Sequence, residues 1–172
     1  MRDAANCLPR SQVKIIRLGD RYVDLHSPQE RARVSPLALR LFLSLMNEWE
    51  VSDEDARVLL GRLTNETFAA LRGAPDTQVL DAAQLKRVAN LLGIHRELSL
   101  LYGAGIANEW VRLPNSHPMF CRVKPLTYMV IGGVQAMANV LHLLTKRRKG
   151  SVGSTADDGG PLSSPETPAP PD

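Results

Sequence analysis

Apolar residues recur at helical spacing over most of the chain. Between Ser35 and Lys146 they fall three and four positions apart, in stretches that glycine or proline residues interrupt. The pattern predicts an all-α protein, a small multi-helix bundle, because each amphipathic helix must bury its apolar stripe against another. Ahead of these helices, the apolar residues Val13, Ile15 and Ile16, followed by Gly19-Asp20, predict a short strand and turn.

Capping residues and helix breakers set the expected bounds of the helices. Ser35 followed by Pro36 is the expected start of the first helix, which makes residues 28–36 a linker. The next three helices are expected to begin at a capping side chain and end at a glycine: Ser52 to Gly61, Thr64 to Gly73 and Asp81 to Gly93.

The last third of the sequence predicts two more helical stretches around an irregular segment. One runs from Leu98 to Trp110 and bends near Gly103, and the other begins at Pro125, is interrupted at Gly132-Gly133 and ends near Lys146. The chain therefore divides into an N-terminal segment, two helical domains and a tail: 1–34, 35–102, 103–149 and 150–172. The tail has almost no large apolar residues, so it is expected to be disordered.

Composition and charge restrict the class of protein. Of the 172 residues, 44% are hydrophobic and 23% charged, as in a globular protein, and the formal net charge is only +3. The tail carries four acidic and no basic residues, whereas the cations of the rest are spread out rather than clustered. A mildly basic surface of this kind could approach phosphates, but it is no strong nucleic-acid signature.

The few candidate catalytic groups are scattered. Four histidines occur, and the closest approach to a dyad is His117, four positions before Cys121, with no orienting group indicated. No phosphate-binding loop and no metal-ligand spacing is present, so we expect neither enzyme activity nor a cofactor. The two cysteines lie far apart, and we see no signal peptide and no run of ~20 apolar residues. We therefore expect a cytoplasmic protein with reduced thiols and no membrane partner.

The segment Val51–Gly73 has the pattern of a helix-turn-helix. Its second helix presents polar side chains outward, as a DNA-reading helix does, and the candidate DNA-binding residues are Arg62, Thr64, Asn65 and Arg72. A three-helix core unit without DNA has the same pattern, and the acidic first helix and Glu66 would face phosphates badly. Both interpretations remain open.

The stretch 110–126, WVRLPNSHPMFCRVKPL, is the most unusual part of the sequence. Prolines at 114, 118 and 125 stiffen it, and Asn115 can turn the backbone through its side chain. It is longer than helix connections normally need, so it is either an ordinary loop or a functional one.

Two stretches together resemble a known family. Residues 48–102, beginning EWEVSDEDARVLLGRLTNETFAAL, and residues 106–144, with Trp110, Pro114-Asn115 and Pro125-Leu126 in order, resemble the Xre/MbcA/ParS antitoxins of type II toxin–antitoxin systems. The resemblance departs at Cys121-Arg122, where the family usually has a glycine pair, so this turn is expected to differ.

The resemblance implies a non-enzymatic antitoxin. Its C-terminal domain, residues 103–149, would bind a RES-type toxin that degrades NAD or uses it for ADP-ribosylation, and would cover the NAD-binding cleft. Such proteins often form homodimers or hetero-oligomers with the toxin and repress their own promoter. The candidate toxin-binding residues are Trp110, Asn115, Arg122, Lys124 and Pro125. The alternative is a DNA-binding transcriptional regulator without a toxin, and the two differ in whether a neighbouring gene encodes one.

Overall fold

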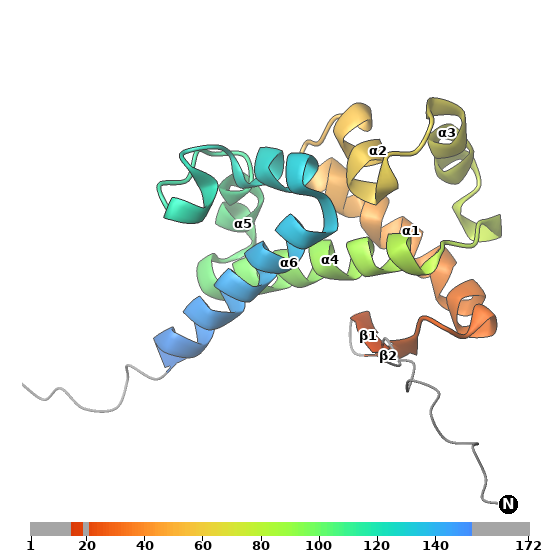
Figure 1. Cartoon of the computed structure of the whole chain (residues 1–172), viewed down its shortest axis with the longest axis horizontal. Coiled ribbons are helices and arrows are strands. Elements are labelled where there is room, and N and C mark those ends of the chain that lie inside the picture. The colour runs from red at the N-terminus through yellow and green to blue at the C-terminus, as the bar shows by residue number, and fades with distance from the viewer. Residues whose placement is uncertain (1–14, 19–20, 153–172) are drawn as a thin grey trace, which may run out of the picture.

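The computed structural model describes residues 15–18 and 21–152, and within them the fold is all-α. Six α-helices pack together, and a β-hairpin of two four-residue strands packs against two of the long helices (Figure 1). In the hairpin β1 (Ile15–Leu18) runs antiparallel to β2 (Arg21–Asp24), with Ile16 opposite Val23. The expected strand is therefore present, while Val13 and the turn at 19–20 lie outside the described residues.

The first helix begins earlier than its sequence predicts. Helix α1 spans Pro28–Glu48, and its N-cap is Ser27, whose hydroxyl accepts a hydrogen bond from the Glu30 amide at 3.2 Å. The expected N-cap Ser35 is instead buried inside the helix: its hydroxyl donates to the Arg31 carbonyl at 2.6 Å and accepts from the Leu80 amide at 2.8 Å. The linker expected at 28–36 is thus wrong, because both Ser-Pro pairs can start a helix and tertiary contacts select the first.

The second and third helices follow the expected caps. Helix α2 spans Asp53–Gly61 and α3 spans Asn65–Gly73, and the hydroxyls of Ser52 and Thr64 accept from the first-turn amides. Helix α3 packs at the edge of the molecule, on a short 3-10 turn η1 (Pro75–Thr77), and buries only Phe68 and Leu71 (Figure 1).

Helix α4 (Ala82–Tyr102) is the central element and is longer than expected. Asp81 caps it in a reciprocal arrangement with Gln84, as the sequence predicts, but Gly93 does not end it. A β-carbon at Gly93 would lie 3.1 Å from two methyl carbons of Leu141, so this glycine lets another helix approach closely. The helix ends at Gly103, whose φ of 81° separates it from α5 (Ala104–Trp110), as expected.

Helix α6 spans Pro125–Val152 and consists of two helical pieces. Gly133, at φ 61° and ψ −146°, breaks it where the glycine pair predicts, and the second piece packs along α4. Its stretch Pro125–Gly150 is, among the described residues, the one helix long and apolar enough to cross a membrane. A core helix of a bundle passes the same test, so length and composition alone decide nothing here.

The buried side chains form one core that extends from the hairpin to the end of α6. It is mainly aliphatic, and its largest fully buried members include Phe42, Trp49 and Phe120. The expected boundary at 102–103 coincides with the break between α4 and α5, yet buried residues on both sides belong to this same core. The two helical halves are therefore packed together rather than joined by a free linker.

Candidate functional site

The segment between α5 and α6 is a loop closed by its own backbone. The Leu126 amide donates to the Val111 carbonyl at 2.9 Å, which joins the two ends of the loop. Inside it, the Val123 amide donates to the Phe120 carbonyl at 2.8 Å, and a 3-10 turn η2 spans Pro118–Phe120. A loop with its ends bonded together and its interior in turns has few alternative conformations.

Phe120 holds this loop through a group of aromatic rings that we call the aromatic cluster. Its own side chain is buried, and three rings lie edge-on against it: Trp110 at 5.7 Å, His117 at 6.1 Å and Tyr128 at 5.5 Å between centroids. Edge-to-face pairs at such distances add to the energy of burial. The cluster joins α5, the loop and the first turn of α6 into one rigid unit.

Sequence reasoning missed the role of His117 in the cluster. His117 is a structural residue, because its Nδ1 accepts a hydrogen bond from the Met119 amide at 3.2 Å. The thiol of Cys121 approaches the Pro118 carbonyl at 3.5 Å rather than the imidazole, so the two residues form no dyad. The aromatic residues on either side of a proline-rich stretch were the signal that could have indicated the cluster.

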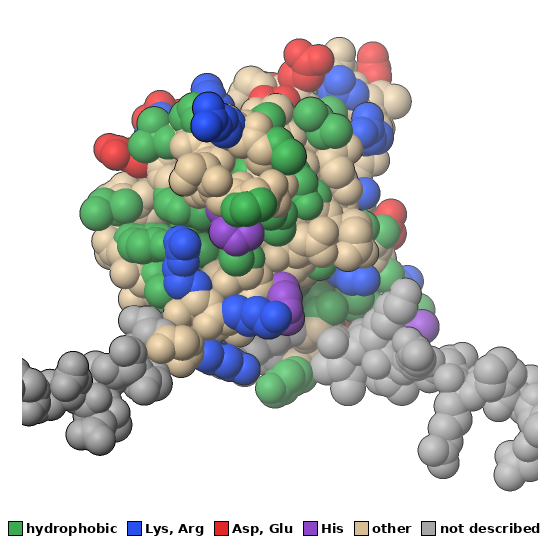
Figure 2. Space-filling model, turned by 60° about the vertical axis from the view of Figure 1, so that its left-hand side comes forward, with side chains coloured by type: hydrophobic (Ala, Val, Ile, Leu, Met, Phe, Trp, Pro, Cys, Tyr) green, Lys and Arg blue, Asp and Glu red, His purple; other side chains and the backbone are tan. Residues whose placement is uncertain are grey.

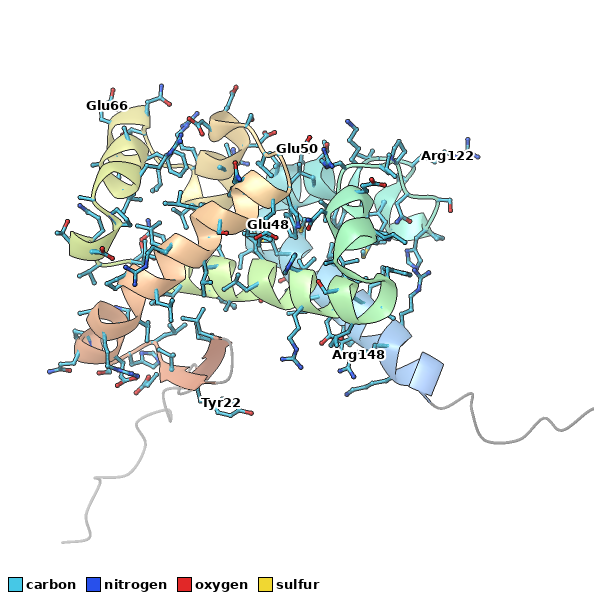
Figure 3. All side chains as sticks on the ribbon, turned by 180° about the vertical axis from the view of Figure 1, so that it is seen from behind. Tyr22, Glu48, Glu50, Glu66, Arg122 and Arg148 are labelled. Atoms are coloured by element: carbon cyan, nitrogen blue, oxygen red, sulfur yellow. The ribbon has the colours of Figure 1, made fainter. Side chains whose placement is uncertain are left out.

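The five sequence-predicted toxin-binding residues divide into two groups. Trp110 is half-buried in the aromatic cluster, Pro125 is buried at the start of α6, and the Asn115 side chain accepts from the His117 amide at 2.9 Å. These three build the loop. Arg122 and Lys124 are exposed, and Figure 3 shows Arg122 projecting from the molecule at the end that carries the loop.

Cys121 and Arg122 both adopt left-handed backbone conformations, with φ of 49° and 65°. Glycine reaches this region without the steric cost that a β-carbon brings. The sequence departs from the family pattern at these residues, yet the backbone here has the conformation that glycine favours.

Replacing Cys121 or Arg122 by glycine should therefore stabilise the protein. Each change removes a left-handed penalty of roughly 1–2 kcal/mol, partly offset by the freedom that glycine adds to the unfolded chain, so we expect a net gain of about 0.5–1 kcal/mol. Urea denaturation monitored by circular dichroism measures it. Val123→Gly is the matched control, because Val123 has no positive φ and this variant should lose stability. Equal changes in stability at all three positions would show that the left-handed backbone of Cys121 and Arg122 does not cost stability.

Several exposed apolar side chains belong to the part of the chain that contains this loop. Of the nine large hydrophobic residues that are exposed among the described ones, five lie between positions 100 and 131: Leu100, Ile106, Leu113, Val123 and Ile131. We call these five, with Arg122 and Lys124, the C-terminal face. Figure 2 shows hydrophobic side chains gathered on this side of the molecule, with Lys and Arg among them and Asp and Glu toward the edges.

The C-terminal face is more basic than acidic. Residues 103–131 contain one carboxylate, Glu109, and three cations. One cation, Arg112, is paired with Glu50 at the end of α1, which leaves Arg122 and Lys124 without an ion pair among the described residues. An exposed apolar surface with free cations is typical of a site that binds another protein.

The predicted DNA-binding residues come from α2, α3 and the turn between them, and Figure 3 shows Glu66 of α3 at the end of the molecule away from Arg122. Thr64 caps α3, Arg62 takes the left-handed position that ends α2, and Arg72 is paired with Asp53. Asn65 is exposed and lines a hollow of about 520 Å³ between the two helices. The structure thus brings together Asn65 and Arg72 but neutralises the arginine.

The charges near α3 do not favour phosphates. Hydrogen bonds from its own backbone amide and from the Thr64 hydroxyl lower the pKa of the Glu66 carboxyl below its ordinary value, so Glu66 is an anion at neutral pH. It stands in the first turn of α3, where a DNA-reading helix would enter the groove. Segment 52–73 carries four carboxylates against three arginines.

Within the described ranges, no three His, Cys, Asp or Glu side chains lie close enough together to hold a metal ion. Comparison of the chain with protein-family models, with curated proteins and with solved structures gives no match. The resemblance to the Xre/MbcA/ParS antitoxins therefore rests on residues 48–102 and 106–144 alone.

Proposed function

We propose that this protein is the antitoxin of a type II toxin–antitoxin pair, and that it binds and neutralises a RES-type toxin through the C-terminal face. The observation that carries the proposal is that five of the nine exposed large apolar side chains of the described residues, and two free cations, lie between the end of α4 and the first piece of α6, the stretch that contains the rigid loop. The sequence resemblance in the same region, residues 106–144, implies a partner of the RES-toxin class.

The rigidity of the loop supports tight binding. Because the aromatic cluster and the Leu126–Val111 hydrogen bond already fix the loop, docking a partner on it costs little conformational entropy. Its exposed apolar groups then contribute burial, and Arg122 and Lys124 favour a partner whose rim carries carboxylates. The partner surface would be apolar at its centre and acidic at its edge.

The cleanest test uses the whole chain. A chain ending at Gly103 would lose Phe120, Met137, Val140 and Leu144 from the core, so its failure to neutralise would report unfolding. Substitutions of exposed residues avoid this problem, since they leave the buried side chains in place.

Two paired variants should weaken neutralisation: Leu113→Asp with Ile131→Asp, and Arg122→Glu with Lys124→Glu. Leu113 and Ile131 are 56% and 72% exposed, so polar residues are tolerated there in the free protein. If a toxin buries these two side chains, each substitution costs about 1.5–3 kcal/mol of binding free energy, or roughly a ten- to hundredfold loss of affinity. The charge reversal should slow association and reduce its salt dependence. Co-expression with the toxin that a neighbouring gene encodes measures neutralisation, and co-purification measures binding.

The control is Asn65→Ala with Arg72→Ala on the α2–α3 end, which should rescue growth as the unchanged protein does. Neutralisation lost in this control but kept in both C-terminal variants would overturn the proposal and favour a site on α2 and α3. If no neighbouring gene encodes a toxin, the alternative is favoured, namely a DNA-binding transcriptional regulator.

A further inference from the structure

A second surface, separate from the C-terminal face, is a groove between the hairpin, α1, α4 and α6. It encloses about 630 Å³ and has an apolar floor, made by Ile16, Leu41, Ala89, Leu92 and Leu141. Leu41 of α1 is 39% exposed although β1, α4 and α6 line the same groove. Nothing among the described residues covers this floor.

One end of the groove is basic. Arg96 of α4 and Lys149 of α6 line it and are exposed, and neither has an ion pair among the described residues. Arg148 lines it too but is neutralised by the buried Glu97, with 2.5 Å between Arg148 Nε and Glu97 Oε2. The groove therefore presents two free cations beside an apolar floor, and its occupant should be acidic with a few apolar side chains.

The chain itself continues from this basic end. Helix α6 ends at Val152, three residues beyond Lys149, and twenty residues follow. They contain four carboxylates and no cation, and one large aliphatic residue, Leu162. An extended segment spans about 3.3 Å per residue, so a few residues suffice to run back past the ~12 Å of helix between Lys149 and Leu141.

We propose that the acidic tail, residues 153–172, docks in this groove, with carboxylates on Arg96 and Lys149 and Leu162 on the apolar floor. The tail is expected to have no structure of its own, and docking requires none, because the groove supplies the apolar surface. The other terminal segment, 1–14, precedes β1, whose Ile16 lines the groove, but it carries three cations against one carboxylate, so Arg96 and Lys149 would repel it.

The proposal predicts that removing the tail changes the groove. In ¹H–¹⁵N NMR spectra, the full chain and a chain ending at Val152 should differ at the amides of Ile16, Leu41 and Leu92. The differences should shrink at 0.5 M salt, because exposed charge pairs are screened there. Unchanged signals at these three amides, with differences only near Val152, would overturn the proposal.

Matched variants separate charge from length. A full-length tail with Asp157→Asn, Asp158→Asn, Glu166→Gln and Asp172→Asn should give the spectrum of the shortened chain at the groove. Arg96→Glu with Lys149→Glu should do the same, while Lys86→Glu, an exposed cation of α4 outside the groove, should not. Groove signals that respond to deletion of residues 1–14 and not to the tail would show that the other terminus is the occupant. This test is independent of toxin binding.

Discussion

Replacing Phe120 by alanine is expected to lower the free energy of unfolding by about 3–5 kcal/mol, the range for buried aromatic residues cut to alanine. Phe120 is 1% exposed, and three rings lose their central partner in the variant. The loop should loosen as well, so neutralisation should fall even where the protein remains folded. Urea denaturation followed by tryptophan fluorescence measures the stability, and Trp110 lies directly in the cluster.

Leu113→Ala is the matched control for this prediction. Leu113 belongs to the same loop but is 56% exposed, so its loss should change stability by no more than about 0.5 kcal/mol. A Phe120 variant as stable as the Leu113 variant would mean that the aromatic cluster does not hold the loop.

Arg148→Met should have the second largest effect and lower the free energy of unfolding by about 3 kcal/mol. The Glu97 side chain is 8% exposed and its ion pair with Arg148 lies between α4 and α6, so removing the arginine leaves a buried carboxylate without its partner. Glu97→Gln should cost less, because Arg148 is 32% exposed and water can solvate it. Thermal and urea unfolding of both variants measure the difference.

The double variant, Glu97→Met with Arg148→Met, completes this experiment. Removing both charges replaces the ion pair with apolar packing, so stability should return toward that of the unchanged protein. If the double variant is less stable than Arg148→Met alone, the apolar pair packs poorly and the cost does not arise from an unpaired Glu97.

The sequence indicates helices well wherever a local signal is sufficient. Ser52, Thr64 and Asp81 cap helices as predicted, since a capping side chain acts on amides two or three residues away. The errors are at Ser35 and Gly93, where distant partners decide the outcome. Ser35 is placed by the Leu80 amide and Gly93 by Leu141, and no local pattern indicates either contact.

The candidate site follows the same division. The position of the loop could be predicted from its prolines, but which of its residues face solvent could not. Trp110, Asn115 and Pro125 are conspicuous residue types that turn out to build the loop, whereas Leu113 and Ile131 look like core residues and are exposed. The exposure of an apolar residue depends on which face of the folded unit it occupies.

Because the helices share one core, binding at the C-terminal face also affects how long other parts of the chain survive proteolysis. Since α2 buries Leu59 and Leu60 in the same core as α6 and packs against it, a protease can reach α2 mainly when this shared core opens. A partner held at one hundred times its Kd on the C-terminal face would make that opening rarer by about 2.7 kcal/mol, or roughly a hundredfold. Degradation of α2 would then slow as the partner is supplied, although α2 carries none of the residues of the C-terminal face.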